Sequence, residues 1–573
     1  MLLALVFVLA AWSIPRSGSA TTAILDQHLI ERLATAPADE QIGVILTYDD
    51  RPGDPELAQL EALGALVVAF RHLPLAAALA TPAQIEEART LPGVRAVYLN
   101  RPLQFYLRES VPLIGASEVW QHDGATGKGI GIAILDTGLD ATHPDLALGS
   151  TTRQNVKILG LQFAAGQNLT RLDLPLFYLE DQLNTDTTSG HGTHVAGIAG
   201  ASGAASNGYY RGVAPGAQLV GLGAGEAIEI FTALAGFDYI LEHRERYNIR
   251  VVNCSWGDTT PGFDPEHPVN RATQTLHDAG ITVVFAAGNA GSTTDTLNTY
   301  SVAPWVIGVA AGEKDGQTVA FFSSRGIPGD DFFHPTLTAP GYLIVSDRTA
   351  TGAAVNVTST TLDPIFVHPD YLHYYTTASG TSMAAPHVAG AVALMLEANS
   401  SLTPDVVKRV LINTATPMPQ FQEYAAGAGY LNARAAVETA RSIKHIRSYR
   451  DPRTGKDEQV YDLTKTWEGT VAASLPGLPS VDQQSLVVQQ GTISLDIAID
   501  WDLVASDLDL YLYAPDGTLA AQSMVVQSIY GYANETAHVD SPAPGTWLVE
   551  VRGMLNAPQP YRGTANAVVL VNP

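Results

Sequence analysis

Cysteine is almost absent from this sequence, with Cys254 the single one among 573 residues. An intramolecular disulfide is therefore excluded, and stability must come from packing or from bound metal. Cys254 ends an apolar run at residues 251–254, where a buried, unreactive thiol is far more common than a nucleophile. Thiol chemistry is not expected.

Positive charge is also scarce. The chain has 32 Lys and Arg against 57 Asp and Glu, a formal net charge of −25. Such a surplus of carboxylates repels nucleic-acid phosphates and anionic lipid surfaces, so we expect no nucleic acid among the partners. The plain interpretation of the surplus is solubility, and the alternative is cation binding.

Long apolar runs are rare. Beyond the first eleven residues no stretch reaches eighteen consecutive apolar residues, which predicts no membrane span in the mature chain. Residues 1–11 form an apolar run too short to span a bilayer, and the small residues Gly18, Ser19 and Ala20 follow. This pattern predicts an export signal at residues 1–20 and a secreted, extracellular protein, and the alternative is that the segment is kept as an anchor.

The length predicts several folding units. Residues 21–107 mix short strands and helices, which indicates a small α/β domain. Residues 108–445 alternate apolar runs with helices, which predicts a mostly parallel sheet with helices on both faces. A polar linker is expected at residues 446–467. Residues 468–573 alternate apolar and polar side chains between turns, which predicts a β-sandwich.

Polar residues follow several expected strands of the middle unit. In open α/β sheets, functional sites lie at the carboxyl ends of the strands. The strand expected at residues 130–135 runs into Asp136, and the strand at 282–287 leads to Gly288 and Asn289. A lone Asp at a strand end is ordinarily a turn former, so the position alone is weak evidence.

Two further motifs open helices. Ser189-Gly190-His191-Gly192-Thr193-His194 puts a histidine in a first turn, and Ser379-Gly380-Thr381-Ser382-Met383 does the same for a serine. Backbone N–H groups at a helix start suit a developing oxyanion, although a serine there is ordinarily an N-cap. His191 and His194 lack the accompanying glutamate of a zinc protease motif, which argues against a zinc site.

Hydrolysis of a peptide bond needs a nucleophile, a base, a group that orients the base, and donors for the oxyanion. The four motifs together resemble those of the subtilisin-like serine protease family. The chain order Asp136, His191, Ser382 is that of subtilisin, and it differs from the Ser, Asp, His order of α/β-hydrolases.

The resemblance implies a secreted serine endopeptidase that works through an acyl-enzyme and needs no cofactor. It implies that Ser382 is the nucleophile, His191 its base and Asp136 the orienting carboxylate. Asn289 corresponds to the side-chain donor of the oxyanion hole, beside the Ser382 N–H. The alternative is a triad-bearing binding protein with a closed or silent cleft.

The same resemblance implies where a polypeptide substrate binds. Ser255, Trp256 and Gly257 would form an edge to which the substrate adds as a strand, and Ala287 and Gly288 would form the other wall of the primary pocket. We place Asn298 near the pocket floor. No acidic residue stands among them, which favours uncharged side chains and broad specificity.

The flanking units resemble known accessory domains. Residues 21–107 resemble the inhibitory propeptide of these proteases, which implies an intramolecular inhibitor; the alternative is a permanent accessory domain. Residues 468–573 resemble the prepeptidase C-terminal domain of secreted bacterial proteases.

Structural calcium is a further implication. Asp145, in His143-Pro144-Asp145-Leu146, matches an aspartate that chelates calcium in some family members. Its companion loop, within residues 201–210, does not match the usual calcium loop. Asp507 and Asp509 are additional candidates for a hard cation, although alternating Asp on a strand is more often a solvated face.

Overall fold

The computed structural model describes residues 23–70, 73–100, 110–164, 173–258, 260, 262–351, 362–452, 454–475, 477–503, 505–525 and 533–572. The expected signal at residues 1–20 and the end of the expected propeptide near residues 104–107 lie outside this set. The chain divides into two compact units, residues 1–104 and 105–573. Within the described part of the chain, no helix is both long enough and apolar enough to cross a bilayer.

The first unit is a five-stranded sheet in the order β1-β5-β2-β4-β3. Every second residue of β2 is buried, from Ile42 to Tyr48, so one face of the sheet carries the core. β4 was not predicted, because its alanines have little preference for strands. The elements are β1 (Ile24–Leu25), α1 (Gln27–Leu33), β2 (Ile42–Tyr48), α2 (Asp54–Ala62), β3 (Leu66–Ala69), β4 (Leu75–Ala80), α3 (Pro82–Ala88) and β5 (Val94–Leu99).

The second unit is built on an eight-stranded sheet in the order β13-β12-β11-β10-β6-β9-β7-β8. Its strand pairs are parallel, except for β7 with β8. The strands are β6 (Gly131–Asp136), β7 (Thr152–Ile158), β8 (Tyr178–Leu179), β9 (Gln218–Gly223), β10 (Ile249–Cys254), β11 (Thr282–Ala286), β12 (Val306–Gly312) and β13 (Leu337–Pro340). β14 (Ile344–Asp347) and β15 (Tyr375–Ala378) form a separate antiparallel ribbon.

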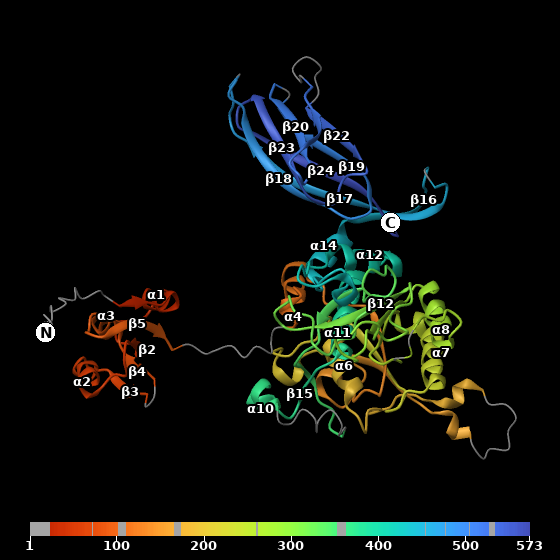
Figure 1. Cartoon of the computed structure of the whole chain (residues 1–573), viewed down its shortest axis with the longest axis horizontal. Helices are drawn as coiled ribbons and strands as arrows, with labels where there is room; N and C mark the ends of the chain where they lie inside the picture. Colours follow the sequence, from red (N-terminus) through yellow and green to blue (C-terminus); the bar gives the residue numbers. More distant parts are fainter. Residues whose placement is uncertain are drawn as a thin grey trace, which may run out of the picture. The chain divides into compact units, whose positions relative to one another are not determined.

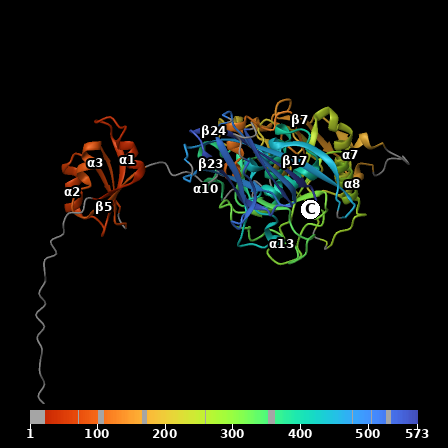
Figure 2. The same ribbon diagram turned by 90° about the horizontal axis from the view of Figure 1, so that it is seen from above.

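Helices cover both faces of this sheet, as predicted. Ile132 and Ile134 of β6 join one core cluster with α6 (His191–Gly200) and α11 (Thr381–Ala398). Ala133 and Leu135 point the other way, into a second cluster with α7 (Ile230–Tyr247) and α8 (Pro268–Asp278). Figures 1 and 2 show α7 and α8 side by side. The remaining helices are α4 (Ser110–Leu113), α5 (Ala116–Glu118), α10 (Asp363–Phe366), α12 (Pro404–Thr414), α13 (Glu423–Ala426) and α14 (Ala433–Ser442).

A single carboxylate anchors the entry to β6. Glu397, near the end of α11, accepts hydrogen bonds from three successive backbone N–H groups, those of Thr126 at 2.7 Å, Gly127 at 2.5 Å and Lys128 at 2.9 Å. Hydrogen bonds to a charged acceptor are about twice as strong as neutral ones. The long helix α11 therefore also fixes the start of the central strand.

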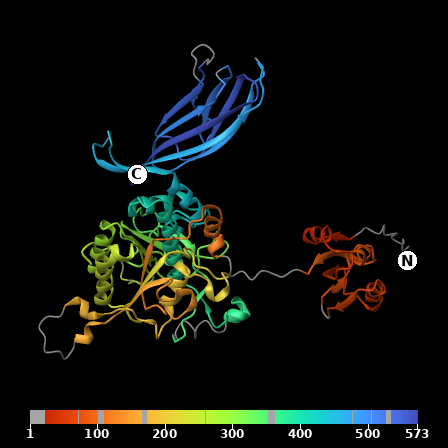
Figure 3. The ribbon, with the colours of Figure 1, turned by 180° about the vertical axis from the view of Figure 1, so that it is seen from behind.

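The C-terminal part is a sandwich of two antiparallel sheets, drawn in blue in Figures 1 and 3. Their orders are β16-β17-β24-β19-β22 and β18-β23-β20-β21, and apolar side chains from both meet in one core. The strands are β16 (Ile443–Arg450), β17 (Asp457–Val471), β18 (Ser480–Val488), β19 (Thr492–Asp500), β20 (Asp507–Tyr513), β21 (Leu519–Ser523), β22 (Asn534–Asp540), β23 (Gly545–Leu555) and β24 (Gln559–Leu570).

The segment expected as a linker, residues 446–467, instead contains most of β16 and β17. Its charged residues pair across the hairpin that β16 and β17 form at the edge of the five-stranded sheet, Arg447 with Asp462 and Arg450 with Asp457. The polar composition reflects an exposed hairpin, which sequence patterning cannot distinguish from a linker.

Candidate active site

Asp136 is the last residue of β6, the strand between β10 and β9. Its side chain is 1% exposed. One oxygen, Oδ1, lies 2.6 Å from Nδ1 of His191 and accepts a hydrogen bond from the Thr137 N–H at 2.8 Å. The carboxylate predicted at the sheet edge is thus in direct contact with the predicted histidine.

His191 is the first residue of α6, and the preceding Gly190 has the left-handed φ of 82°. The helix approaches β6 so closely that a Cβ on Gly192 would lie 2.1 Å from the Gly138 carbonyl oxygen. Only glycine fits at this contact. It brings the start of α6 against the end of β6.

Asp186, which the sequence did not single out, fastens the histidine helix to the Asp136 loop. Its Oδ1 accepts from the Gly190 N–H and the Thr137 hydroxyl, and its Oδ2 accepts from the N–H and the hydroxyl of Thr193. The signal available was its place five residues before His191, which is weak because Asp commonly precedes a helix.

Electrostatics distinguish the two histidines. Burial lowers the pKa of His191, but the charge and hydrogen bond of Asp136 outweigh it, so the pKa is raised above its usual value. Burial lowers the pKa of His194 to about 3. His194 Nε2 lies within hydrogen-bond distance of two carbonyl oxygens, those of Ile344 and Thr376.

Ser382 is the second residue of α11, and a proline four residues later shapes its surroundings. Pro386 has no N–H, so the Ser382 carbonyl lacks its helical donor. The Ser255 hydroxyl donates to that carbonyl at 2.8 Å, and the Ser382 hydroxyl donates to the Ser255 carbonyl at 3.0 Å. The reciprocal pair ties the start of α11 to the end of β10.

Asn289 follows β11 and is held through its oxygen. Oδ1 accepts from the N–H of Thr381 at 2.9 Å and from its hydroxyl at 3.0 Å. A Cβ built on Gly380 would lie 3.4 Å from Asn289 Nδ2 and 3.6 Å from the Ser382 N. Two N–H donors therefore border one small space, and the Ser382 N–H belongs to a first turn without helical acceptors.

Asn298 links the two expected walls of the substrate pocket. Its Nδ2 donates to the carbonyls of Trp256 and Ala286, at 3.0 and 2.8 Å, and its N–H donates to the Ala287 carbonyl at 2.8 Å. Gly257 has no room for a side chain, because a Cβ there would lie 2.0 Å from Asn298 Nδ2. Gly288, whose N–H donates to the Thr381 hydroxyl, connects the wall to α11.

Burial also shifts the pKa of several other titratable side chains. Cys254 is fully buried, and burial raises the pKa of its thiol well above the usual value. Burial lowers the pKa of His387 to about 4, and its Nδ1 contacts the Met383 carbonyl. In the sandwich, burial and the neighbouring Asp507 raise the pKa of Asp509 to about 6.

Asp145 is buried in η2 (Pro144–Leu146), and the expected companion loop does contact it. The contact is an N–H: Ala205 donates to Oδ1 at 2.7 Å, and the Tyr375 hydroxyl donates to Oδ2 at 2.7 Å. Calcium takes six to eight oxygen ligands. The loop therefore contributes an N–H here instead of the further oxygen ligands that a calcium ion needs.

Known proteins resemble this chain. The family model described as "Subtilase family" matches residues 127–438. Serine protease AprX of Bacillus subtilis (strain 168) is 32% identical over 401 residues, covering 67% of this chain and 83% of that protein. Subtilisin BL of Lederbergia lenta is 32% identical over 318 residues, 55% of this chain and 93% of that protein. The solved structure of Sphericase covers 55% of this chain at 26% identity, with a TM-score of 0.43.

The contact between Asp136 and His191 generates a first prediction. Asp136→Asn should lower the His191 pKa, because burial is then opposed only by the charge of Asp186. NMR titration of the imidazole signals measures this pKa, and His191→Gln assigns the signal. An unchanged pKa would show that the Asp136 charge does not act on this imidazole.

The same shift has a consequence for stability. The His191 pKa is raised on folding, so protonation of His191 stabilises the fold at pH values below the unfolded pKa, about 6.5. This contribution is lost as the pH rises through the folded pKa. In Asp136→Asn it should be smaller.

Proposed function

This chain belongs to the subtilase family and is a serine endopeptidase, and on that premise we propose that Asp136, His191 and Ser382 are its catalytic triad. The observation that carries the assignment is the 2.6 Å contact between Asp136 Oδ1 and His191 Nδ1. Ser382 supports it from the start of α11, a helix that packs against α6.

The proposed mechanism follows from the tautomer that this contact selects. Nδ1–H donates to Asp136, so Nε2 of neutral His191 carries the lone pair. Nε2 takes the proton of the Ser382 hydroxyl as Oγ attacks the scissile carbonyl, and it returns that proton to the leaving amine. Water then attacks the acyl-enzyme, His191 accepts its proton, and the Ser382 hydroxyl is restored with release of the acid. Neutral imidazole is required, so the base works at pH values above its raised pKa.

We assign the oxyanion hole to Asn289 Nδ2 and the Ser382 N–H. Thr381 holds the amide oxygen of Asn289, which orients the amide so that its nitrogen donates. Both donors border the space in front of Gly380, where a side chain would intrude. Donors fixed before the reaction stabilise the oxyanion without reorganisation.

The substrate is polypeptide, and we propose that it binds as a strand along Ser255, Trp256 and Gly257. Hydrogen bonds that hold this edge in place support the proposal. The Trp256 indole N–H donates to the Leu135 carbonyl at 2.8 Å, and Asn298 donates to carbonyl oxygens of both walls. Ala287 and Gly288 on the other wall carry no charge. Broad specificity with uncharged side chains in the primary pocket is the corresponding proposal.

We further propose that the protein is secreted and that residues 21–107 act as an intramolecular inhibitor. The described part of this segment has its own sheet and core cluster, as a separable domain requires. Catalysis by members of the family needs no cofactor. Calcium at Asp507 and Asp509 stays a prediction.

Replacing each triad residue tests the assignment. Ser382→Ala, His191→Ala and Asp136→Ala should each nearly abolish casein hydrolysis while circular dichroism stays unchanged, because the three residues act as one unit. A serine-directed sulfonyl fluoride should inhibit the unmodified protein to the same extent. Hydrolysis retained by Ser382→Ala would reject the triad, and an inactive, folded wild type would favour the binding-protein alternative.

Two substitutions test the oxyanion hole. Asn289→Ala should lower kcat by roughly a hundred- to a thousandfold with little change in KM, because the amide donor acts in the transition state. Asn289→Asp is the matched variant: it keeps the oxygen that Thr381 holds but loses the donor, so it should be equally impaired. If Asn289→Asp kept full activity, or if only KM changed, Asn289 would be a structural residue.

Maturation tests the inhibitor proposal. Wild type should lose residues 21–107 by its own activity, giving an N-terminus near residues 104–112, whereas Ser382→Ala should keep the segment. N-terminal sequencing of both proteins, made in a host without extracellular proteases, measures this. Cutting of Ser382→Ala at the same place, or full activity of wild type with the segment still attached, would contradict the proposal.

A further inference from the structure

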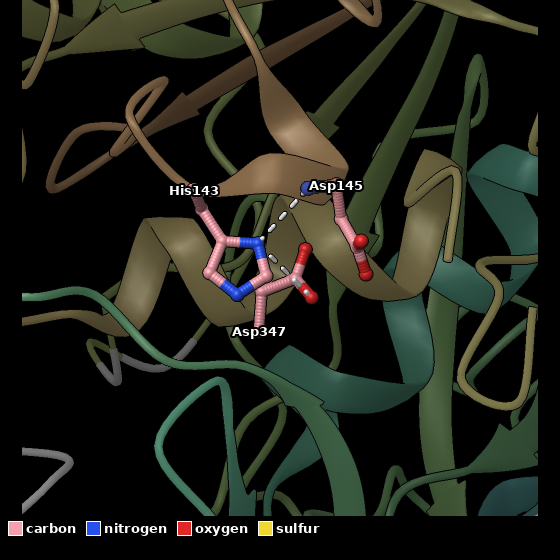
Figure 4. A group of neighbouring side chains, drawn as sticks. All are labelled: His143, Asp145 and Asp347. Atoms are coloured by element: carbon pink, nitrogen blue, oxygen red, sulfur yellow. Dashed lines mark hydrogen bonds and ion pairs between the residues drawn. The ribbon is translucent and has the colours of Figure 1, made fainter. Parts of the chain in front are cut away.

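We infer that His143, Asp145 and Asp347 form a binding site for one divalent transition-metal ion of the zinc class, separate from the proposed triad. The three side chains come from η2 and from the end of β14, about two hundred residues apart in sequence. One ligand atom from each lies within 4.8 Å of the others. Figure 4 shows the imidazole and the two carboxylates turned toward one another.

All three side chains are buried. Asp145 and Asp347 are fully buried and His143 is 5% exposed. Neither oxygen of Asp347 accepts a hydrogen bond from a described residue, although both are shielded from solvent. A buried carboxylate without donors is rare and costly, and a bound cation would remove that cost. Among the described residues, no Lys or Arg pairs with Asp145 or Asp347, and the one ion-pair contact of Asp347 is with His143.

The histidine is held in the tautomer that a metal ligand needs. His143 Nε2 lies 2.9 Å from the Tyr374 carbonyl oxygen, so this nitrogen carries the proton and Nδ1 carries the lone pair. Metal-ligating histidines typically donate their other N–H to a carbonyl in this way. Nδ1 receives only a 3.2 Å contact from the Asp145 N–H, at the long end of the hydrogen-bond range.

The second carboxylate is oriented from outside the cluster. Tyr375 and Ala205 donate to Asp145, one to each oxygen, at 2.7 Å. Each oxygen keeps a further lone pair, and ligating carboxylates are commonly hydrogen-bonded in this manner. These hydrogen bonds therefore hold Asp145 in place and leave a lone pair on each oxygen for a metal ion.

The geometry favours zinc over calcium. Zinc bonds of about 2.0–2.2 Å in a tetrahedron put neighbouring ligand atoms about 3.4 Å apart. His143 Nδ1 and Asp347 Oδ1 are 3.7 Å apart, near this separation, and all three ligand atoms lie within 4.8 Å of one another, so the side chains must move inward to close around an ion. One imidazole and two carboxylates with a water suit zinc, whereas calcium needs six to eight oxygens.

A cavity of about 490 Å³ lies next to the cluster, because Asp347 and Tyr375 are part of its lining.

The cluster also lies against the helix that carries His191. Asp347 Oδ2 lies 2.8 Å from where a Cβ on Gly197 of α6 would be, and Tyr375 begins the strand that leads to the Ser382 helix. A metal here would tie β14, β15 and η2 together beneath α6.

The test uses the full chain with Ser382→Ala, purified without chelator, so that self-digestion does not consume the sample. Elemental analysis should find about one zinc per chain, and Co²⁺ exchanged into the site should give the intense visible absorption of a tetrahedral N/O site. Adding Asp347→Asn should reduce the zinc content and the cobalt absorption to background. If that variant does not fold, His143→Gln takes its place and should give the same result. Asp363→Asn is the matched control, because it removes a neighbouring buried carboxylate that already has donors.

Chelation gives the second measurement. A strong zinc chelator should lower the melting temperature of Ser382→Ala and of its Asp363→Asn variant, and zinc should restore it, while Asp347→Asn should not respond. Metal-free protein, calcium as the sole bound ion, or equal zinc in Asp347→Asn and Asp363→Asn would overturn the inference. Metal content is independent of the role of Ser382, so failure here is distinguishable from failure of the proposed triad.

Discussion

The burial of one carboxylate, that of Asp136, is the constraint on which the rest of the site depends. At the end of a central parallel strand its side chain has almost no access to water. An isolated buried charge costs several kcal/mol unless donors replace the water. Here the Thr137 N–H and His191 Nδ1–H both donate to Oδ1, and the start of α6 lies directly against this carboxylate. Asp186 then makes that start rigid by accepting four hydrogen bonds from the loop and the helix.

The position of Ser382 at the start of α11 depends on a backbone N–H donor that is missing from this helix. Because Pro386 leaves the Ser382 carbonyl free, the Ser255 hydroxyl can bond it, and Ser382 returns a hydrogen bond to the Ser255 backbone. Thr381, one residue earlier, holds Asn289. The proposed nucleophile and oxyanion donors are thus positioned by backbone groups that regular secondary structure leaves unpaired.

Sequence patterning predicted those parts of the fold that depend on local periodicity. The central strands, the helices on both faces and the positions of Asp136 and His191 at element ends all follow from apolar runs and small-residue helix starts. The alanine strand β4 and the charged hairpin of β16 and β17 were missed because their composition is that of other structures. Asp186 and Asp347 could not be found, since their importance arises from contacts that only the fold creates.

Asp347 differs from three other buried aspartates in its hydrogen bonds. Asp140, Asp186 and Asp363 are as deeply buried, yet each accepts hydrogen bonds on both oxygens from side chains and backbone N–H groups. Hydrogen-bond donors thus surround these three carboxylates, whereas no described residue donates to Asp347. The side chains that face Asp347 instead are a carboxylate and an imidazole lone pair, both of which repel a second anion. A positive charge placed between them makes this arrangement favourable, and a metal ion would supply that charge while holding all three side chains at once.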